Sequence, residues 1–260
     1  MPSLNNAARR AVLIDFDDTL VYTNTVFDAA KEDFYAFMRG KNLYDSNLAD
    51  KLNEIDKKNV IAAGYFAARC FPEALAETYR YYCALFGRSL CQADEDYCLS
   101  LGRAVYSAIP EQLPFAAELL CKLRKDYVLY LITQGDPAIQ PTRIEKSGLR
   151  PFFERIYIPK MKKREVYSEI IAENMLDAAA SWIIGNSLRF DIAPAAAAGL
   201  NAVYLRVDCW DFENTENTEN TENLKNIKKD VADCEYHTAA NLCECLAIIN
   251  KQKVNFEVNP

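Results

Sequence analysis

The stretch Ala11-Val-Leu-Ile-Asp15-Phe-Asp-Asp-Thr-Leu20 contains the strongest signal for the fold. Its first four residues are apolar and predict a short strand buried in a parallel sheet. Three carboxylates follow within four positions, and unpaired charges are too costly to bury in an apolar core. We therefore expect the strand to end at Asp15, with the carboxylates at the sheet edge where α/β proteins bind their ligands.

The composition is ordinary for a soluble globular protein and restricts the choice of partner. The 260 residues are 50% hydrophobic and 26% charged, and 30 basic against 37 acidic residues give a net charge of -7. A phosphate backbone recruits basic surface, so nucleic acid is not an expected partner. The polar N-terminus and the absence of a long apolar run predict neither a signal peptide nor a membrane span, and we expect a cytoplasmic protein.

The histidine and cysteine counts disfavour several kinds of site. His237 is the only histidine, which excludes a multi-histidine metal site within one chain. None of the nine cysteines forms a C-x-x-C pair or precedes an arginine by six positions, so a zinc ribbon and a cysteine-phosphatase loop have no support. We expect reduced, mostly buried thiols.

Residues 21–112 have the periodicity of helices. Apolar side chains recur at helical spacing, for example at Phe34 and Met38 and at Leu75 and Tyr79. A helical block of this length between two strands of one sheet predicts an inserted subdomain.

Strands and helices alternate after the insert, which predicts a doubly wound parallel α/β sheet. This core is expected to comprise residues 1–20 and 113–260, with 21–112 as the helical subdomain. Tandem Glu-Asn-Thr repeats at 211–223 have no apolar face and predict a disordered loop. Further strands are expected at 127–132, 155–158, 182–184 and 202–205, and helices at 115–125, 141–147, 165–175, 191–198 and 240–249.

Reactive side chains follow three of the predicted strands, and a basic cluster precedes one helix. Because the carboxyl ends of parallel strands meet at one sheet edge, we expect these residues to converge. The segments are Asp15-Phe-Asp-Asp-Thr19, Thr133, Gly185-Asn-Ser-Leu-Arg-Phe-Asp191 and the basic cluster Lys160-Met-Lys-Lys-Arg164.

These segments resemble, in order, the four motifs of the haloacid dehalogenase-like (HAD) superfamily. Residues 12–20 are similar to hhhDxDxT and 131–136 to a strand ending in Thr or Ser. Residues 162–167 are similar to a lysine just ahead of a helix, and 183–192 to GDxxxxD. One D-x-D-x-T motif is a weak signal, but four motifs in register with the strands are strong. The resemblance covers residues 11 to about 206 and implies a HAD-like Rossmannoid core with a helical C1 cap.

The resemblance implies that Asp15 and Asp17 are catalytic. A carboxylate at Asp15 can attack phosphorus and form an acyl phosphate. Strand side chains alternate with period two, so Asp17 points the same way and can protonate the leaving alkoxide and then deprotonate water. Thr133, with the backbone N–H groups of Gln134 and Gly135, is expected to bind the phosphoryl oxygens.

Lys162 is the lysine that the resemblance places in the site, where it would neutralise phosphate charge and hold Asp15. Lys160 and Lys163 also fit the pattern, so the choice among the three stays open. Thr19, the last residue of the first motif, is expected among the substrate-binding residues.

Mg²⁺ is the cofactor that the resemblance implies, because a cation relieves the repulsion between a carboxylate nucleophile and a phosphate. The expected ligands are Asp15, the backbone carbonyl of Asp17, Asn186 and Asp191. Asn186 departs from the motif, which has an acid there. An amide oxygen can ligate a metal but carries no charge, so weaker Mg²⁺ binding or slower turnover is expected, with Asp191 as the acidic ligand.

The acid at position 17 favours cleavage of a phosphate ester, since the dehalogenase branch lacks it and a halide leaving group needs no proton. The length and the missing membrane helices exclude a P-type ATPase. We expect a Mg²⁺-dependent phosphatase that hydrolyses a small phosphomonoester, a sugar phosphate or a nucleoside monophosphate, through an aspartyl-phosphate. A phosphomutase or other phosphotransferase stays open, as does a catalytically weak protein that binds a phosphorylated ligand.

The helical insert is expected to choose the substrate, because a capped site excludes bulk water and restricts size. Helical aromatic residues are more often core, and lone arginines more often surface, than ligand contacts. The oligomeric state stays open. The side chains that could contact a substrate are Asn24, Phe27, Arg69, Phe71, Arg103 and Tyr106.

Overall fold

The structure is a computed structural model that describes residues 9–207 and 234–258. The chain forms two compact units: unit 1 is Met1–Tyr22, Glu111–Thr133 and Ser147–Pro260, and unit 2 is Thr23–Pro110 and Gln134–Lys146. Segment 134–146, which the sequence analysis assigned to the core, belongs to unit 2. The predicted disordered repeat at 211–223 lies outside the described residues.

Unit 1 contains a six-stranded parallel sheet with the strand order β3-β2-β1-β4-β5-β6. This confirms the predicted doubly wound α/β core. The central strand is entirely apolar, and its four residues are closed to solvent. The strands are β1 (Ala11–Ile14), β2 (Val128–Ile132), β3 (Arg155–Tyr157), β4 (Trp182–Gly185), β5 (Asn201–Leu205) and β6 (His237–Ala239).

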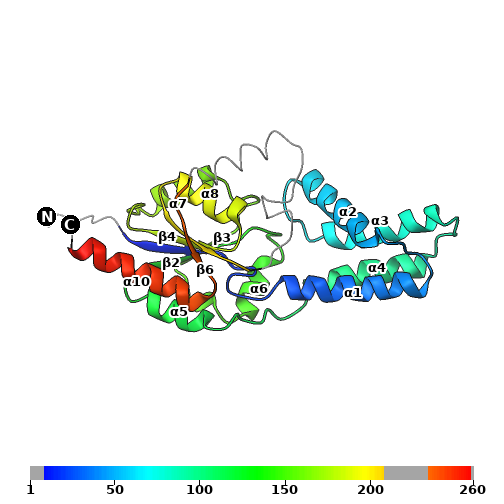
Figure 1. The fold of residues 1–260 in the computed structure, drawn as a ribbon, viewed down its shortest axis with the longest axis horizontal. Coiled ribbons are helices and arrows are strands. Elements are labelled where there is room, and N and C mark those ends of the chain that lie inside the picture. The colour runs from blue at the N-terminus through cyan, green and yellow to red at the C-terminus, as the bar shows by residue number, and fades with distance from the viewer. Residues whose placement is uncertain (1–8, 208–233, 259–260) are drawn as a thin grey trace. The chain divides into compact units, whose positions relative to one another are not determined.

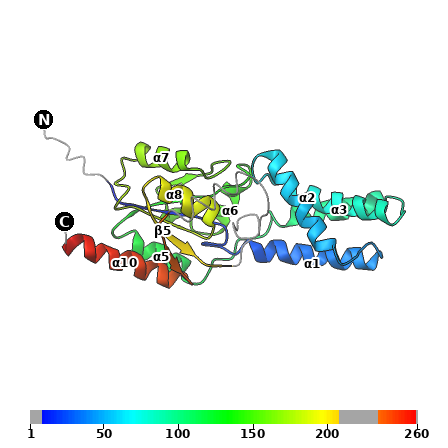
Figure 2. The ribbon, with the colours of Figure 1, turned by 45° about the horizontal axis from the view of Figure 1, so that its top comes forward.

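Helices cover both faces of this sheet, which is why its central strands are apolar on both sides. Helices α5 (Ala116–Leu123) and α10 (Leu242–Val258) lie on one face (Figures 1 and 2). Helices α7 (Arg164–Glu173) and α8 (Ala193–Ala197) lie on the other (Figures 1 and 2). A short 3₁₀ turn, η1 (Arg150–Phe152), precedes β3.

Unit 2 is helical throughout. Its core is built from large apolar and aromatic side chains, among which Phe34, Met38, Leu75, Tyr79 and Tyr82 are almost completely buried. The tyrosines keep their hydroxyls at the polar edge of this core, where that of Tyr82 donates to a carboxylate. The helices are α1 (Asn24–Gly40), α2 (Leu48–Ala63), α3 (Cys70–Leu85), α4 (Gln92–Ala104) and α6 (Gln140–Lys146).

The chain leaves unit 1 and returns to it at neighbouring points. The backbone N–H of Tyr22 donates to the carbonyl of Glu111 at 2.8 Å, and that of Leu113 donates to the carbonyl of Leu20 at 2.8 Å. Both connections therefore run side by side at the edge of unit 1.

Three local features differ from the sequence predictions. The predicted helix at 191–198 is divided into a π-helical turn, η2 (Leu188–Ile192), and α8. Strand β6 was not predicted, because it has three residues and two of them are exposed. The eight described cysteines are free, and only four of them are buried, so the prediction of mostly buried thiols was too strong.

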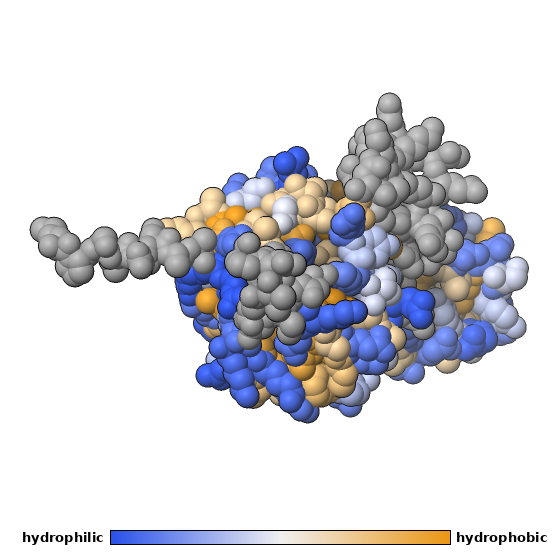
Figure 3. Space-filling view, turned by 60° about the vertical axis from the view of Figure 1, so that its left-hand side comes forward, coloured by the Kyte–Doolittle hydropathy of each residue, from blue (hydrophilic) through white to orange (hydrophobic). Residues whose placement is uncertain are grey.

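Within the described residues, no helix combines the length and apolarity needed to cross a membrane. On the face drawn in Figure 3, hydrophilic and apolar residues are interspersed.

Gly102 allows α3 and α4 to approach closely, and Gly102→Ala should destabilise unit 2. A Cβ at this position would lie 2.4 Å from the Cα of Pro72, a backbone atom that cannot rotate away. We expect a loss of about 1–3 kcal/mol in the free energy of unfolding, measured by urea denaturation. Gly40→Ala is the control, since no atom lies within 4 Å of its new Cβ. Equal stability of the two variants would contradict the close packing.

Candidate active site

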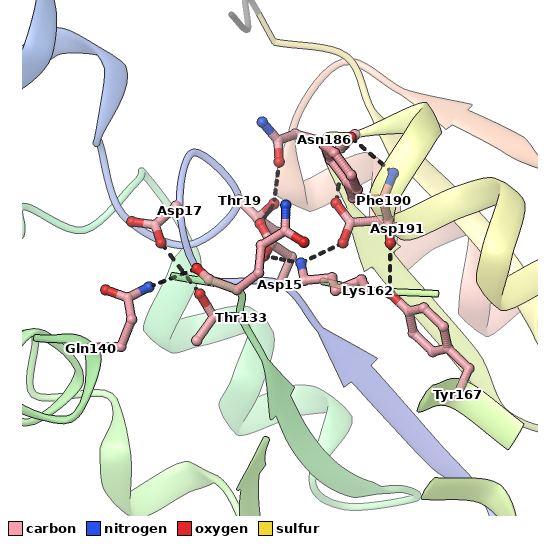
Figure 4. Close-up of polar contacts among 12 residues, drawn as sticks. Asp15, Asp17, Thr19, Thr133, Gln140, Lys162, Tyr167, Asn186, Phe190 and Asp191 are labelled. Carbon is pink, nitrogen blue, oxygen red and sulfur yellow. Dashed lines mark hydrogen bonds and ion pairs between the residues drawn. The ribbon is translucent and has the colours of Figure 1, made fainter. Parts of the chain in front are cut away.

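The candidate site lies at the carboxyl edge of the sheet in unit 1. Asp15 follows β1, Thr133 follows β2 and Asn186 follows β4. Strand β1 pairs with both β2 and β4, so the three strand ends are neighbours. Figure 4 shows the side chains of these segments pointing toward one another.

A tight turn after β1 fixes the first carboxylate. Asp18 adopts a left-handed backbone conformation with φ of 55°, and its N–H donates to the carbonyl of Val21 at 2.8 Å. The turn brings the hydroxyl of Thr19 back to Oδ2 of Asp15, to which it donates at 2.8 Å. Thr19 is completely buried, which suits a role in positioning Asp15 better than the substrate contact expected from the sequence.

Lys162 lies between two buried carboxylates. Its Nζ donates to Oδ1 of Asp15 and to Oδ1 of Asp191, both at 2.5 Å (Figure 4). All three side chains are at least 94% buried. Of the three lysines that the sequence left open, Lys162 is the one in this cluster, while Lys160 and Lys163 are exposed.

The electrostatics of the cluster follow from its burial. Burial raises the pKa of Asp15, and the charge of Lys162 opposes this rise without cancelling it. Burial alone lowers the pKa of Lys162, but the charges of Asp15 and Asp191 outweigh it, so the pKa lies above the usual value and the ammonium stays charged. Two carboxylates and one ammonium leave a net negative charge that favours a further cation.

Asp191 is held by the turn η2. Its Oδ2 accepts from the backbone N–H of Ser187 at 3.0 Å, and Oγ of Ser187 accepts from the N–H of Phe190 at 3.1 Å. A Cβ on Gly185 would lie 2.4 Å from Cγ of Asp191, so this carboxylate requires glycine at the end of β4. This role of Ser187 was not predicted from the sequence, although a short hydroxyl residue beside Asn186 is a typical turn and cap residue.

Tyr167 supports the same turn from α7. It is completely buried, and its hydroxyl donates to the carbonyl of Phe190 at 3.1 Å (Figure 4). Burial raises the pKa of Tyr167 well above the usual value, so it remains a neutral hydrogen-bond donor.

Asn186 faces an arrangement of oxygens that fits a metal ion. One polar atom of its amide lies 3.3 Å from Oγ1 of Thr19, Oδ2 of Asp15 and the backbone carbonyl of Asp17. If this atom is the amide nitrogen, it can donate to these oxygens. If it is the amide oxygen, it faces two other acceptors, an arrangement that a cation would stabilise.

The expected ligand set is only partly acidic. Among the described residues, no group of three or more His, Cys, Asp or Glu side chains could hold a metal ion. A hard cation here would use Asp15, the Asp17 carbonyl and the Asn186 amide oxygen. Asp191, the fourth expected ligand, already accepts a hydrogen bond on each oxygen, one from Lys162 and one from the Ser187 N–H. In this arrangement it holds Lys162 in place beside Asp15.

Asp17 and Thr133 meet at the other side of the cluster. The hydroxyl of Thr133 donates to Oδ2 of Asp17 at 3.3 Å, and Asp17 is half-buried while Thr133 is closed to solvent. Gln134 and Gly135, whose backbone N–H groups were expected to bind phosphoryl oxygens, belong to unit 2. There the carbonyl of Gln134 accepts from Nε2 of Gln140 at 3.3 Å.

The family model of haloacid dehalogenase-like hydrolases matches residues 9–199. This chain belongs to that family. The protein is therefore a hydrolase of the HAD type, as the four motifs indicated.

Two curated relatives align with part of the chain. The HAD-hydrolase YfnB of Bacillus subtilis is 31% identical over 99 residues, which are 36% of this chain and 42% of that protein. The pyrimidine 5'-nucleotidase PynA of Streptococcus pneumoniae is 31% identical over 101 residues, which are 36% of this chain and 43% of that protein. The chain thus matches less than half the length of these relatives.

Solved structures show the same fold over nearly the whole chain. A haloacid dehalogenase-like family hydrolase from Xanthomonas campestris superposes with a TM-score of 0.76 at 23% identity, covering 98% of this chain and 97% of that one. The structure of YfnB bound to magnesium superposes with a TM-score of 0.60 at 19% sequence identity, covering 94% of this chain and 100% of that one. The L-2-haloacid dehalogenase of Xanthobacter autotrophicus superposes with a TM-score of 0.58 at 15% sequence identity, covering 93% of this chain and 98% of that one.

Lys162→Ala should strongly destabilise unit 1. It removes the ammonium that pairs with both Asp15 and Asp191 and leaves two buried carboxylates without this partner. We expect a loss of about 3–5 kcal/mol, measured by chemical denaturation. Lys163→Ala changes the adjacent, exposed lysine and should stay within about 0.5 kcal/mol of the parent protein. Similar stability of both variants would rule out the buried ion pair.

Asn186→Asp should make the stability of unit 1 depend on Mg²⁺. The aspartate places a second negative charge beside Oδ2 of Asp15, from which the amide atom lies 3.3 Å, so the metal-free variant should have a lower Tm. The added charge should tighten Mg²⁺ binding at least about tenfold, measured by calorimetry and by the rise of Tm with Mg²⁺. Asn47→Asp, at the exposed start of α2, is the control for charge. If Mg²⁺ raises the Tm of neither the parent protein nor Asn186→Asp, these oxygens do not form a metal site.

Proposed function

We propose that the protein is a Mg²⁺-dependent phosphatase that hydrolyses a small phosphomonoester through an aspartyl-phosphate at Asp15. The observation that carries the proposal is the environment of this carboxylate. Lys162 and Thr19 each hold one of its oxygens, and Asp17 stands two residues further on, in contact with Thr133.

The proposed reaction has two displacements. In the first, a carboxylate oxygen of Asp15 forms a bond to phosphorus while the bond from phosphorus to the ester oxygen breaks, and Asp17 gives its proton to the leaving alkoxide. In the second, water attacks phosphorus and Asp17 takes up a proton from it. The bond to Asp15 breaks, which releases inorganic phosphate and restores both carboxyl groups.

The surrounding residues supply the positive charge that this chemistry needs. Lys162 offsets the charge of Asp15 and would offset that of the phosphoryl group. Thr133 offers its hydroxyl to a phosphoryl oxygen once substrate displaces its contact with Asp17. Mg²⁺, held by Asp15, the Asp17 carbonyl and Asn186, would neutralise charge between nucleophile and phosphate.

Asp17 supports a phosphate ester over the carbon–halogen bond of the structurally similar dehalogenases. An alkoxide is a poor leaving group unless it is protonated, whereas a halide leaves as an anion. A carboxyl group on the same strand end as the nucleophile is therefore useful for the first reaction only. The relative PynA, a pyrimidine 5'-nucleotidase by name, supports nucleoside monophosphates as the first substrates to test.

Asp15→Asn should abolish phosphate release from a panel of small phosphomonoesters assayed with and without Mg²⁺. The amide cannot act as nucleophile, so we expect a loss of at least about a thousandfold in kcat. Asp18→Asn is the matched control, because it changes the third carboxylate of the same turn and asparagine tolerates the left-handed backbone there. It should retain most of the activity.

The other outcomes separate the competing functions. Transfer to an added sugar in place of free phosphate would identify a phosphotransferase. Ligand binding without turnover, corrected by Asn186→Asp, would identify a binding protein whose metal site is weak. Release that persists in Asp15→Asn would contradict the proposed mechanism.

A further inference from the structure

The peptide group that joins Phe190 to Asp191 is held at both ends. Its carbonyl accepts from the hydroxyl of Tyr167 at 3.1 Å, and its N–H donates to the carbonyl of Ser187 at 2.9 Å. The N–H of Phe190 is held as well, because it donates to Oγ of Ser187 at 3.1 Å. A peptide group is planar, so fixing its two ends leaves the backbone little freedom to turn the side chain of Asp191.

The sequence explains why a side chain donates to this carbonyl. In a regular helix the carbonyl of Phe190 would accept from the backbone N–H four residues later. That residue is Pro194, which has no N–H. The backbone also departs from a regular helix here, because residues 188–192 form the π-helical turn η2, and such turns are frequent at functional sites. The hydroxyl of Tyr167 takes the place of the helical donor that proline lacks.

The direction of the Asp191 side chain decides where Lys162 lies. Oδ2 of Asp191 accepts from the Ser187 N–H at 3.0 Å, and Oδ1 accepts from Nζ of Lys162 at 2.5 Å. The same ammonium donates to Oδ1 of Asp15 at 2.5 Å. A rotation of the peptide group before Asp191 would therefore move this carboxylate and draw the ammonium away from Asp15.

Tyr167 is itself held in place by its surroundings. The side chain is completely buried in an apolar cluster that also contains Tyr130, Ile183 and Ile192. Such close packing leaves the ring little freedom to move. Helix α7, which carries Tyr167, begins two residues after Lys162. One segment therefore supplies both the lysine and the group that holds the lysine's carboxylate partner.

We propose that Tyr167 is a positioning residue for Lys162. Its hydroxyl fixes the peptide group before Asp191, which directs that carboxylate so that the ammonium stays against Asp15. The effect on catalysis rests on the proposed function, in which Lys162 offsets the charge of the phosphoryl group. The effect on the geometry does not, and it can be measured in the protein without substrate.

Tyr167→Phe removes only the hydroxyl, and Tyr130→Phe is the matched control. Both tyrosines are completely buried in the same apolar cluster, but the hydroxyl of Tyr130 contacts Oε1 of Glu154, at 3.4 Å. With p-nitrophenyl phosphate and Mg²⁺, we expect Tyr167→Phe to lower kcat about tenfold or more and to change KM less than about twofold, because a misplaced ammonium stabilises the transition state less well. Tyr130→Phe should keep the kcat of the parent protein.

The exchange of the Lys162 ammonium protons with water tests the geometry without substrate. Protein labelled with ¹⁵N at lysine gives a nuclear magnetic resonance signal for this buried group, identified by its absence in Lys162→Arg. The amide N–H of Leu13, in β1, is the reference for opening of the whole sheet. Relative to this amide, we expect the ammonium to exchange at least about tenfold faster in Tyr167→Phe and at the parent rate in Tyr130→Phe.

The outcomes separate this proposal from the proposed function. If the parent protein releases no phosphate, or Asp15→Asn releases it equally, the phosphatase function fails, and the exchange measurement still decides the role of Tyr167. If the ammonium and the Leu13 amide exchange faster by the same factor in Tyr167→Phe, the hydroxyl only stabilises the fold and the positioning role is overturned. If the ammonium is loosened but kcat equals that of Tyr130→Phe, the positioning has no effect on the reaction and its catalytic part is overturned.

Discussion

The ammonium of Lys162, held between Asp15 and Asp191, is the interaction on which the rest of the site depends. It joins three segments that are far apart in the chain: the end of β1, the turn after β4 and the residues before α7. Such a group of buried charges stabilises little in itself, because removing the charges from water costs about as much as their attraction returns. Its effect is to fix geometry, since any shift of one segment leaves a charge unpaired.

The sequence was sufficient to predict the elements that this interaction connects. Apolar runs of three to six residues that end abruptly in polar residues are typical of buried strands at a sheet edge. They predicted β1, β2 and β4 and the convergence of Asp15, Thr133 and Asn186. The lysine that contacts Asp15 was harder to predict, because the spacing of the motif alone leaves three candidates. Burial distinguishes them, and burial depends on how the loop before α7 folds back onto the sheet.

Other features depend on contacts that no local pattern encodes. The contact of Thr19 with Asp15 follows from the left-handed turn at Asp18, and the π-helical turn at 188–192 follows from the bond between Asp191 and the Ser187 N–H. In the sequence, Asp56 is an ordinary polar residue of an amphipathic helix. Only the packing of the folded helical unit closes its Oδ1 to solvent without a hydrogen-bond partner.

The paired backbone connections at the edge of unit 1 have an evolutionary consequence. Tyr22 and Glu111 are 89 positions apart in sequence, yet a single backbone hydrogen bond joins them. The two ends of the helical insert therefore lie as close together as the ends of a short surface loop. The length of the insert adds little to the entropic cost of bringing these ends together. Residues between these two points can be replaced, lengthened or exchanged while β1 and its neighbours keep their register. The insert can thus change in sequence and length independently of the residues at the strand ends of the sheet.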